Sequence, residues 1–228
     1  MSDNDNSTSI PPSDAPGTDA GNGIHDEDAI VQAIAAHGVR RRYPRNSVII
    51  AEGDPSDWLY VILSGRVKVY LSDENGREIV LAIRGPKEYV GEMALDSGVR
   101  TASVMTLEAC ELAVVSQQAF RDFIANDSAV AFSLIRKLIS RARQASDHVR
   151  NLALLDVYGR IARLLLDLAV DDGDQLVVRE PLTQQDIAER VGCSREMVSR
   201  IFTDLTAGGY IRIEGRRIHI ERTLPKRW

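Results

Sequence analysis

Cysteine is scarce in this chain of 228 residues, which contains only Cys110 and Cys193. Two distant thiols exclude a framework of several disulfides and a four-cysteine iron–sulfur cluster supplied by one chain. Long apolar runs are also missing, since none approaches the roughly eighteen residues of a membrane-spanning helix. The N-terminus lacks the basic-then-apolar pattern of a secretory signal. These absences predict a reduced, cytoplasmic setting with no membrane partner.

Positive charge is absent from residues 1–30, which contain acids but no Lys or Arg, and the formal net charge of the chain is −5. Residues 1–23 consist largely of Ser, Asp, Asn, Pro, Gly and Thr. We expect them to form a disordered acidic tail, because such a segment cannot offset the entropy lost on ordering. Basic residues gather at the other end: Arg190, Arg195, Arg200, Arg212, Arg216, Arg217, Arg222, Lys226 and Arg227. That end could bind a polyanion.

Signatures of catalysis are missing as well. The sequence has no Ser/His/Asp order, no metal-spaced cluster of His or carboxylate residues, and no phosphate-binding loop. The histidines His25, His37, His148 and His219 are scattered. An enzyme acting on nucleotides is the alternative that these absences disfavour, so we expect no catalytic residues and no metal.

Alternation with a period of two runs from Val39 to about Ser116. The short β-branched runs are "SVII", "WLYVIL", "RVKVYL", "EIVLAI" and "ELAVV". Turn signals at Gly53, Gly65, Gly76 and Gly85-Pro86 separate them. Many short strands at close spacing indicate an antiparallel roll or barrel.

A helical period begins at Ser116, a plausible N-cap for a short helix. A long helix is expected from about residue 128 to about residue 155, and another helix over residues 157–170. Along the long helix, apolar residues recur at steps of four and three: Leu138, Ala142, Ala145, Val149 and Leu152. This heptad seam favours a parallel homodimer. The alternative is a helix face packed on the core of its own chain.

The C-terminal region carries the most specific pattern. Thr183 and Asp186 have the spacing of a capping box that opens a helix. Gly192 can end that helix in the left-handed conformation, and Ser194 can cap the next one. The second helix has a buried stripe at the i, i+3, i+4 and i+7 positions: Val198, Ile201, Phe202 and Leu205. Two strands joined at Glu214-Gly215 follow, so the region is typical of a winged helix-turn-helix.

The outer face of the second helix has the chemistry needed to read DNA bases. Arg can donate two hydrogen bonds to guanine O6 and N7, and Glu can accept one from cytosine N4. We therefore expect Arg195, Glu196 and Arg200 to read adjacent base pairs, the alternative being a merely solvated face. The expected DNA-binding residues are Thr183, Gln185, Ser194, Arg195, Glu196, Ser199 and Arg200.

Three segments carry a family resemblance: "GCSREMVSR", "NLALLDVYGRIARLLLDLA" and "EGDPSDWLYVILSGRVKV". They resemble the bacterial CRP/FNR transcription regulators, especially the branch of the cyclic-AMP receptor protein. The resemblance covers residues 38–222. It implies an α+β fold, with an N-terminal antiparallel β-roll of the cyclic-nucleotide-binding type, a long dimerisation helix and a C-terminal winged helix-turn-helix.

The resemblance also implies domain limits and partners. The expected division is a tail (1–23), a sensor roll (24–127), a dimerisation helix (128–155) and a DNA-binding domain (156–228). The expected partners are palindromic double-stranded DNA, a second copy of the chain and RNA polymerase. Iron–sulfur members of the family carry clustered N-terminal cysteines, which this chain lacks.

A ligand site follows from the same resemblance, on Gly91, Glu92, Arg100, Thr101, Ala102 and Ser146. Arg100 would hold the cyclic phosphate, because the planar guanidinium suits charge-assisted bidentate bonds. Glu92 would accept the ribose hydroxyl, and Ser146 would meet the base, reaching across the dimer. Nucleotide binding would re-pack the roll against the long helix and turn both recognition helices toward DNA.

Two departures from the receptor leave the effector open. The segment between Glu92 and Arg100 is shorter, and Ala145-Ser146 stands where the receptor has a Thr-Ser pair. Cyclic AMP is the preferred effector. The alternatives are cyclic di-GMP, which some family members bind, and a DNA-binding protein that needs no ligand.

Overall fold

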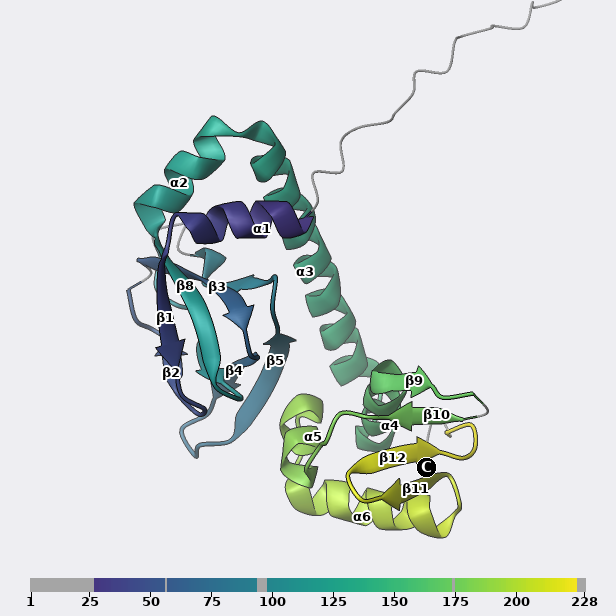
Figure 1. The fold of residues 1–228 in the computed structure, drawn as a ribbon. Helices are drawn as coiled ribbons and strands as arrows, with labels where there is room; N and C mark the ends of the chain where they lie inside the picture. Colours follow the sequence, from purple (N-terminus) through teal and green to yellow (C-terminus); the bar gives the residue numbers. More distant parts are fainter. Residues whose placement is uncertain (1–26, 56, 94–97, 174, 225–228) are drawn as a thin grey trace, which may run out of the picture.

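The computed structural model describes residues 27–55, 57–93, 98–173 and 175–224. They form a β-roll, one long helix and a C-terminal domain of helices with a small sheet (Figure 1). This is the predicted α+β arrangement. The predicted tail, residues 1–23, lies outside the described residues. No described helix is long and apolar enough to cross a membrane.

The roll contains two four-stranded sheets, with strand orders β1-β8-β3-β6 and β2-β7-β4-β5. Its strands are β1 Val39–Tyr43, β2 Val48–Ile50, β3 Trp58–Ser64, β4 Val67–Ser72, β5 Glu78–Arg84, β6 Tyr89–Val90, β7 Ser103–Thr106 and β8 Cys110–Ser116. All paired strands are antiparallel. The five predicted apolar runs correspond to β2, β3, β4, β5 and β8. Strands β1, β6 and β7 lie within the region predicted to alternate but were not among the five runs, and in β1 three consecutive arginines replace the apolar residues.

Alternation along β3 divides the core of the roll. Leu59 and Val61 face helices α1 (Glu27–Ala36) and α2 (Gln117–Asn126), whereas Ile62 faces the interior between the sheets. Gly65, at φ +81°, makes the turn between β3 and β4. A Cβ there would lie 2.6 Å from the carbonyl oxygen of Ala109. Only glycine fits this tight turn.

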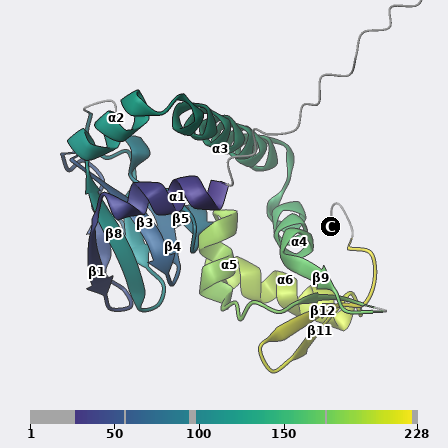
Figure 2. The same cartoon turned by 45° about the horizontal axis from the view of Figure 1, so that its top comes forward.

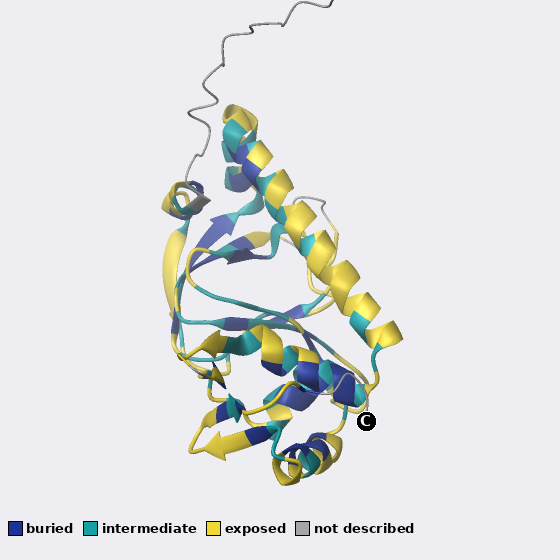
Figure 3. Ribbon diagram, turned by 90° about the vertical axis from the view of Figure 1, so that its right-hand side faces the viewer, coloured by how far each residue is buried: buried dark blue, intermediate teal, exposed yellow. Residues whose placement is uncertain are grey.

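Helix α3 (Ser128–Leu154) runs from the roll to the C-terminal domain (Figure 1). The Asp127 side chain caps it by accepting from the backbone N–H of Ala129, 2.9 Å away. Val130 and Ser133, near its start, are its buried residues. Beyond them the outer face of the helix is exposed along its length (Figure 3).

The C-terminal domain comprises α4 (Val157–Leu168), α5 (Gln184–Val191) and α6 (Arg195–Ala207), with a sheet of order β11-β12-β10-β9. Helix α4 ends two residues before the predicted limit, because the chain continues as β9 (Ala169–Asp171), paired with β10 (Leu176–Val178). This strand pair was not predicted. The wing, by contrast, was predicted: β11 (Ile211–Glu214) and β12 (Arg217–Ile220) pair as a hairpin.

The core of the C-terminal domain provides a test of the packing. Leu165 is fully buried, whereas the adjacent Leu166 is 43% exposed. Leu165→Ala should lower the free energy of unfolding by about 2–5 kcal/mol, through lost burial and the cavity left behind. The control Leu166→Ala should change it by no more than about 0.5 kcal/mol. Urea denaturation measures both, and equal effects would contradict this packing.

Candidate functional site

A cavity of about 430 Å³ lies where the roll, α3 and the C-terminal domain meet. The predicted ligand residues Gly91, Glu92, Arg100, Thr101 and Ala102 all line it. Strands β4 and β5 and helices α3, α4 and α5 complete its wall. The structure therefore brings most of the predicted ligand set together, beside a surface of the C-terminal domain.

Arg100 is the central cation of the cavity and is only 6% exposed. Its guanidinium donates to the carbonyl oxygens of Gly91 (3.1 Å) and Trp58 (2.5 Å). Gly91 is at φ +85°, and a Cβ there would lie 2.8 Å from Nη1 of Arg100. Burial lowers the pKa of Arg100, although nearby acids oppose the shift. The guanidinium stays charged near neutral pH, so a bound anion would compensate its desolvation.

Glu92 forms an ion pair with Arg141 of α3, with 2.6 Å between Oε1 and Nη1. Arg141 also donates to the carbonyl oxygen of Tyr89 at 2.6 Å and lies over the Tyr89 ring. Sequence reasoning missed Arg141. Its position four residues before Ala145 places both on one helix face, a signal that could have identified it. The ion pair joins α3 to Glu92, which follows Gly91, the residue whose carbonyl oxygen accepts from Arg100.

Positive charge exceeds negative charge among the described residues that line the cavity. The cations are Arg84, Arg100, Arg141, Arg160, Arg163 and Arg190, and the acids are Glu92 and Asp167. Some of these cations have partners: Arg160 donates to the carbonyl oxygens of Val191 and Leu155, both at 3.0 Å. Burial, followed by the neighbouring Arg141, lowers the pKa of Arg84. The cavity is suited to an anion.

The predicted helix seam and the cavity share residues. Ala145, Val149 and Leu152 line the cavity, and Val149 is 66% exposed. Ser146 does not line it; the Ser146 hydroxyl donates to the carbonyl oxygen of Ala142 at 3.0 Å. A contact from Ser146 to a ligand would therefore have to come from a second chain. Exposed apolar residues that the sequence analysis missed extend the seam: Phe132, Ile135 and Ile139.

The second candidate site begins at the caps of α5 and α6. The Thr183 hydroxyl accepts from the backbone N–H of Asp186 at 3.1 Å, and the Asp186 carboxylate accepts from that of Thr183 at 2.7 Å. This is the predicted capping box. Gly192 ends α5 at φ 72°, and Ser194 caps α6. The caps thus mark where α5 ends and α6 begins.

The outer face of α6 presents the predicted base-reading residues. Arg195, Glu196 and Arg200 are exposed and Ser199 is half-buried. They border one open depression with Gln184 and Thr203, which sequence reasoning missed. Hydrogen bonds from its own backbone N–H and from Ser194 lower the pKa of Glu196. The ionised carboxylate could accept a hydrogen bond from a base amino group.

Two protein-family models match the chain. A cyclic nucleotide-binding domain matches residues 40–127, which contain the Gly91–Arg100 side of the cavity. A Crp-like helix-turn-helix domain matches residues 159–223, which contain α5 and α6.

Curated relatives and solved structures resemble most of the chain. A CRP-like cAMP-activated global transcriptional regulator of Mycobacterium tuberculosis is 38% identical over 183 residues, which are 78% of this chain and 82% of that protein. The cAMP-activated regulator Vfr of Pseudomonas aeruginosa is 35% identical, over 80% of this chain and 89% of Vfr. The structure of CLP, a c-di-GMP-responsive global regulator of Xanthomonas campestris, superposes with a TM-score of 0.74 at 32% identity. That match covers 86% of this chain and 99% of CLP.

Proposed function

Because the chain belongs to the CRP/FNR family of transcription regulators, we propose that it is a homodimer whose binding to palindromic DNA is gated by a cyclic nucleotide. The family consists of regulators that bind DNA through the helix-turn-helix, not of enzymes. In this proposal the protein acts in the cytoplasm and contacts RNA polymerase when bound to a promoter. The observation that carries it is the buried cation Arg100 in a cavity shared by the roll, α3 and the C-terminal domain.

Cyclic AMP is the effector that we place in the cavity. Its phosphate would accept from Arg100 in place of backbone carbonyls, with Thr101 and Ala102 beside it. The ribose hydroxyl would donate to Glu92, whose carboxylate Arg141 already orients. The cAMP-activated relative of M. tuberculosis, 38% identical, supports this choice.

Cyclic di-GMP is a second candidate because cations continue along the cavity beyond Arg100. Arg84, Arg160 and Arg163 line its wall and could meet a second phosphate. The c-di-GMP-responsive regulator CLP, with a TM-score of 0.74 to this chain, gives this alternative specific support.

Gating would act through shared contacts. The cavity is bordered by Arg190 and Val191 of α5 and by seam residues of α3, so a ligand would touch sensor, seam and reader together. A second chain packed on the seam would cover the exposed apolar face of α3 and close the cavity. The two recognition helices would then enter successive major grooves about 34–36 Å apart.

We expect Arg100→Leu to weaken nucleotide binding by about 2–5 kcal/mol, because the phosphate would lose its charge-assisted partner. Isothermal calorimetry with cyclic AMP and with cyclic di-GMP measures this. The control Arg40→Leu, at an exposed position of β1 outside the cavity, should bind like wild type. Binding of only cyclic di-GMP would establish the second effector. Absence of binding by both nucleotides would reject nucleotide gating and favour ligand-independent DNA binding.

Arg195→Ala should cost about 1–3 kcal/mol of DNA affinity and relax discrimination at one position of each half-site, if Arg195 pairs with a base. Fluorescence anisotropy measures both effects, with a duplex that the wild-type protein selects from a random pool and a series of its single-base variants. Arg40→Ala should leave the ranking of sequences unchanged. A uniform loss of affinity across all sequences would assign Arg195 to the phosphate backbone instead.

Val149→Asp should weaken dimerisation by about 3–5 kcal/mol, because it would bury an unpaired carboxylate in the seam. Val39, 65% exposed on the roll, is a matched position for Val149, which is 66% exposed. Val39→Asp should therefore leave the dimer intact. Sedimentation equilibrium distinguishes the two variants. A Val149→Asp protein that dimerises as tightly as wild type would place the interface elsewhere.

A further inference from the structure

The roll and the C-terminal domain of one chain touch at the hairpin formed by β4 and β5. Helix α5 lies beside these strands (Figure 2). At the end of α5, a Cβ on Gly192 would lie 3.3 Å from Cδ1 of Ile79 in β5. No buried apolar cluster among the described residues spans this boundary. Ion pairs do cross it.

One charge cluster joins β4 and β5 to α5. The Lys68 ammonium donates to the carboxylates of Glu78 on β5 and Glu189 on α5, with 3.1 Å to Glu189. The side chains of Lys68 and Glu189 are 12% and 15% exposed, so water screens them weakly. Burial lowers the pKa of Lys68, but the two carboxylates outweigh it and the net shift is upward. Partial burial and two carboxylate partners distinguish this cluster from an exposed surface ion pair.

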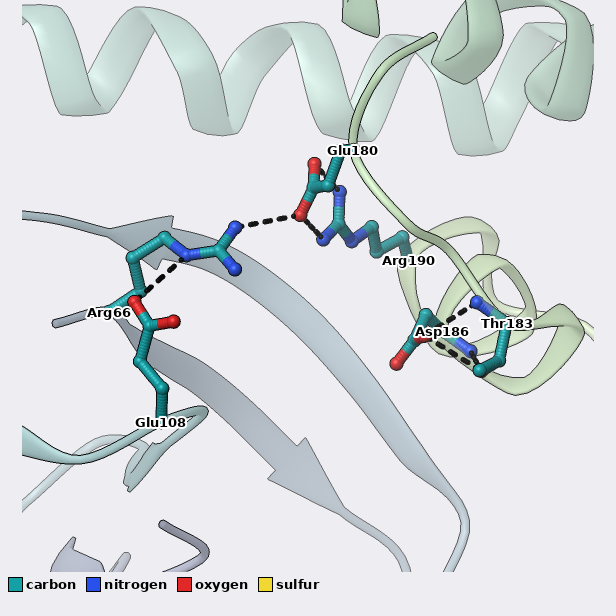
Figure 4. A network of polar contacts seen from close by, with 6 residues as sticks. All are labelled: Arg66, Glu108, Glu180, Thr183, Asp186 and Arg190. Atoms are coloured by element: carbon teal, nitrogen blue, oxygen red, sulfur yellow. Dashed lines mark hydrogen bonds and ion pairs between the residues drawn. The ribbon is translucent and has the colours of Figure 1, made fainter. Parts of the chain in front are cut away.

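A second cluster crosses the same boundary (Figure 4). Arg66, at the start of the hairpin, pairs with Glu108 of the roll at 3.3 Å and with Glu180 of the C-terminal domain at 3.1 Å. Glu180 also accepts from Arg190 of α5 at 2.8 Å. Burial raises the pKa of Glu180, but its arginine partners outweigh this and leave it lowered. Glu180 is thus held as a carboxylate between two guanidinium groups from different domains.

These contacts place the β4–β5 hairpin beside the DNA-reading edge. One hollow is lined on the roll side by Asp73, Arg77 and Glu78. Its other side carries predicted DNA-binding residues: Gln185, Ser194, Arg195 and Glu196. In helix-turn-helix complexes the N-terminal residues of the recognition helix reach the bases, and the preceding helix crosses the backbone. A duplex approaching this edge would meet the hairpin itself, where Asp73 is paired with Arg77 and Glu78 with Lys68, so the hairpin obstructs the approach.

We propose that the two clusters, Lys68–Glu78–Glu189 and Arg66–Glu180–Arg190, form an autoinhibitory latch that holds the DNA-reading edge against the β4–β5 hairpin. The inference rests on the proposed function of a ligand-gated DNA-binding protein and supplies its resting state. With the latch closed, affinity for DNA is low. Opening it moves α5 and α6 away from the hairpin.

The cavity is placed to operate the latch. Arg190 belongs to the second cluster and also lines the cavity. Val69 and Ile79, the chain neighbours of Lys68 and Glu78, line the cavity too. A ligand that fits the cavity better when these walls separate would favour the open state. Ligand and DNA would then strengthen each other's binding by the same factor.

The test removes a positive charge from the roll. Lys68→Met should raise DNA affinity in the absence of nucleotide roughly tenfold, within the range typical of coupling between sites. The physical reason is that Glu78 and Glu189 would face each other without a shared cation. Simple electrostatic attraction to DNA predicts a lower DNA affinity for this variant, since it is less basic than wild type. Anisotropy with a duplex selected by the wild-type protein from a random pool measures the change.

A matched control and a second variant complete the experiment. Lys87, 59% exposed on the roll, pairs with Asp28 of α1, away from α5. Lys87→Met should leave DNA affinity at the wild-type value. Arg66→Met breaks the other cluster and should also raise nucleotide-free affinity, so it tests the latch even if Lys68→Met misfolds. Thermal unfolding verifies that each variant is folded.

Two results would overturn the latch: folded Lys68→Met and Arg66→Met proteins that bind nucleotide-free DNA no better than wild type, or an equal gain in Lys87→Met. These measurements need no effector. A failure of both nucleotides in calorimetry would therefore reject the proposed gating separately, and a gain in the two hairpin variants would still establish the latch.

Discussion

The whole arrangement depends on how α3 is held against the roll. After Ser133 the helix has no buried residue, so apolar packing does not position its second half. Polar contacts position it instead. Arg141 pairs with Glu92 and donates to the carbonyl oxygen of Tyr89. Arg84 donates to the side chain of Gln144 at 3.4 Å. These contacts form one side of the cavity and direct α3 toward the C-terminal domain. A nucleotide that binds Glu92 beside Arg141 would act at this junction.

Arginine performs several distinct tasks here, and burial distinguishes them. Arg100 is almost fully buried and its pKa is lowered by desolvation, so it is suited to an anion. Arg190 is mostly buried too, but a carboxylate of its own domain, Glu180, already neutralises it. Arg195 and Arg200 are exposed on α6, and DNA is the partner proposed for them. The acidic net charge of the chain conceals these local surpluses.

Local signals account for most of what could be predicted about the C-terminal domain. The capping box at Thr183, the left-handed Gly192 and the stripe of Val198, Ile201 and Leu205 depend on neighbours within one or two helical turns. Strand β9 escaped prediction because it follows α4 without a break, so its apolar residues continue the helical pattern. Arg141 escaped because its partners Glu92 and Tyr89 lie about fifty residues away in sequence.

The sequence by itself therefore determined the order of sensor, seam and reader, and most of the residue types that could bind anions and bases. Periodicity, caps and turn residues act over short stretches, so they can be read without coordinates. Only the tertiary structure decided which charges meet. It paired Arg141 with Glu92, directed Ser146 away from the cavity, and placed Glu189 against Lys68. The physical reason is that an ion pair depends on distance in space, and residues far apart in the chain acquire that distance only through folding.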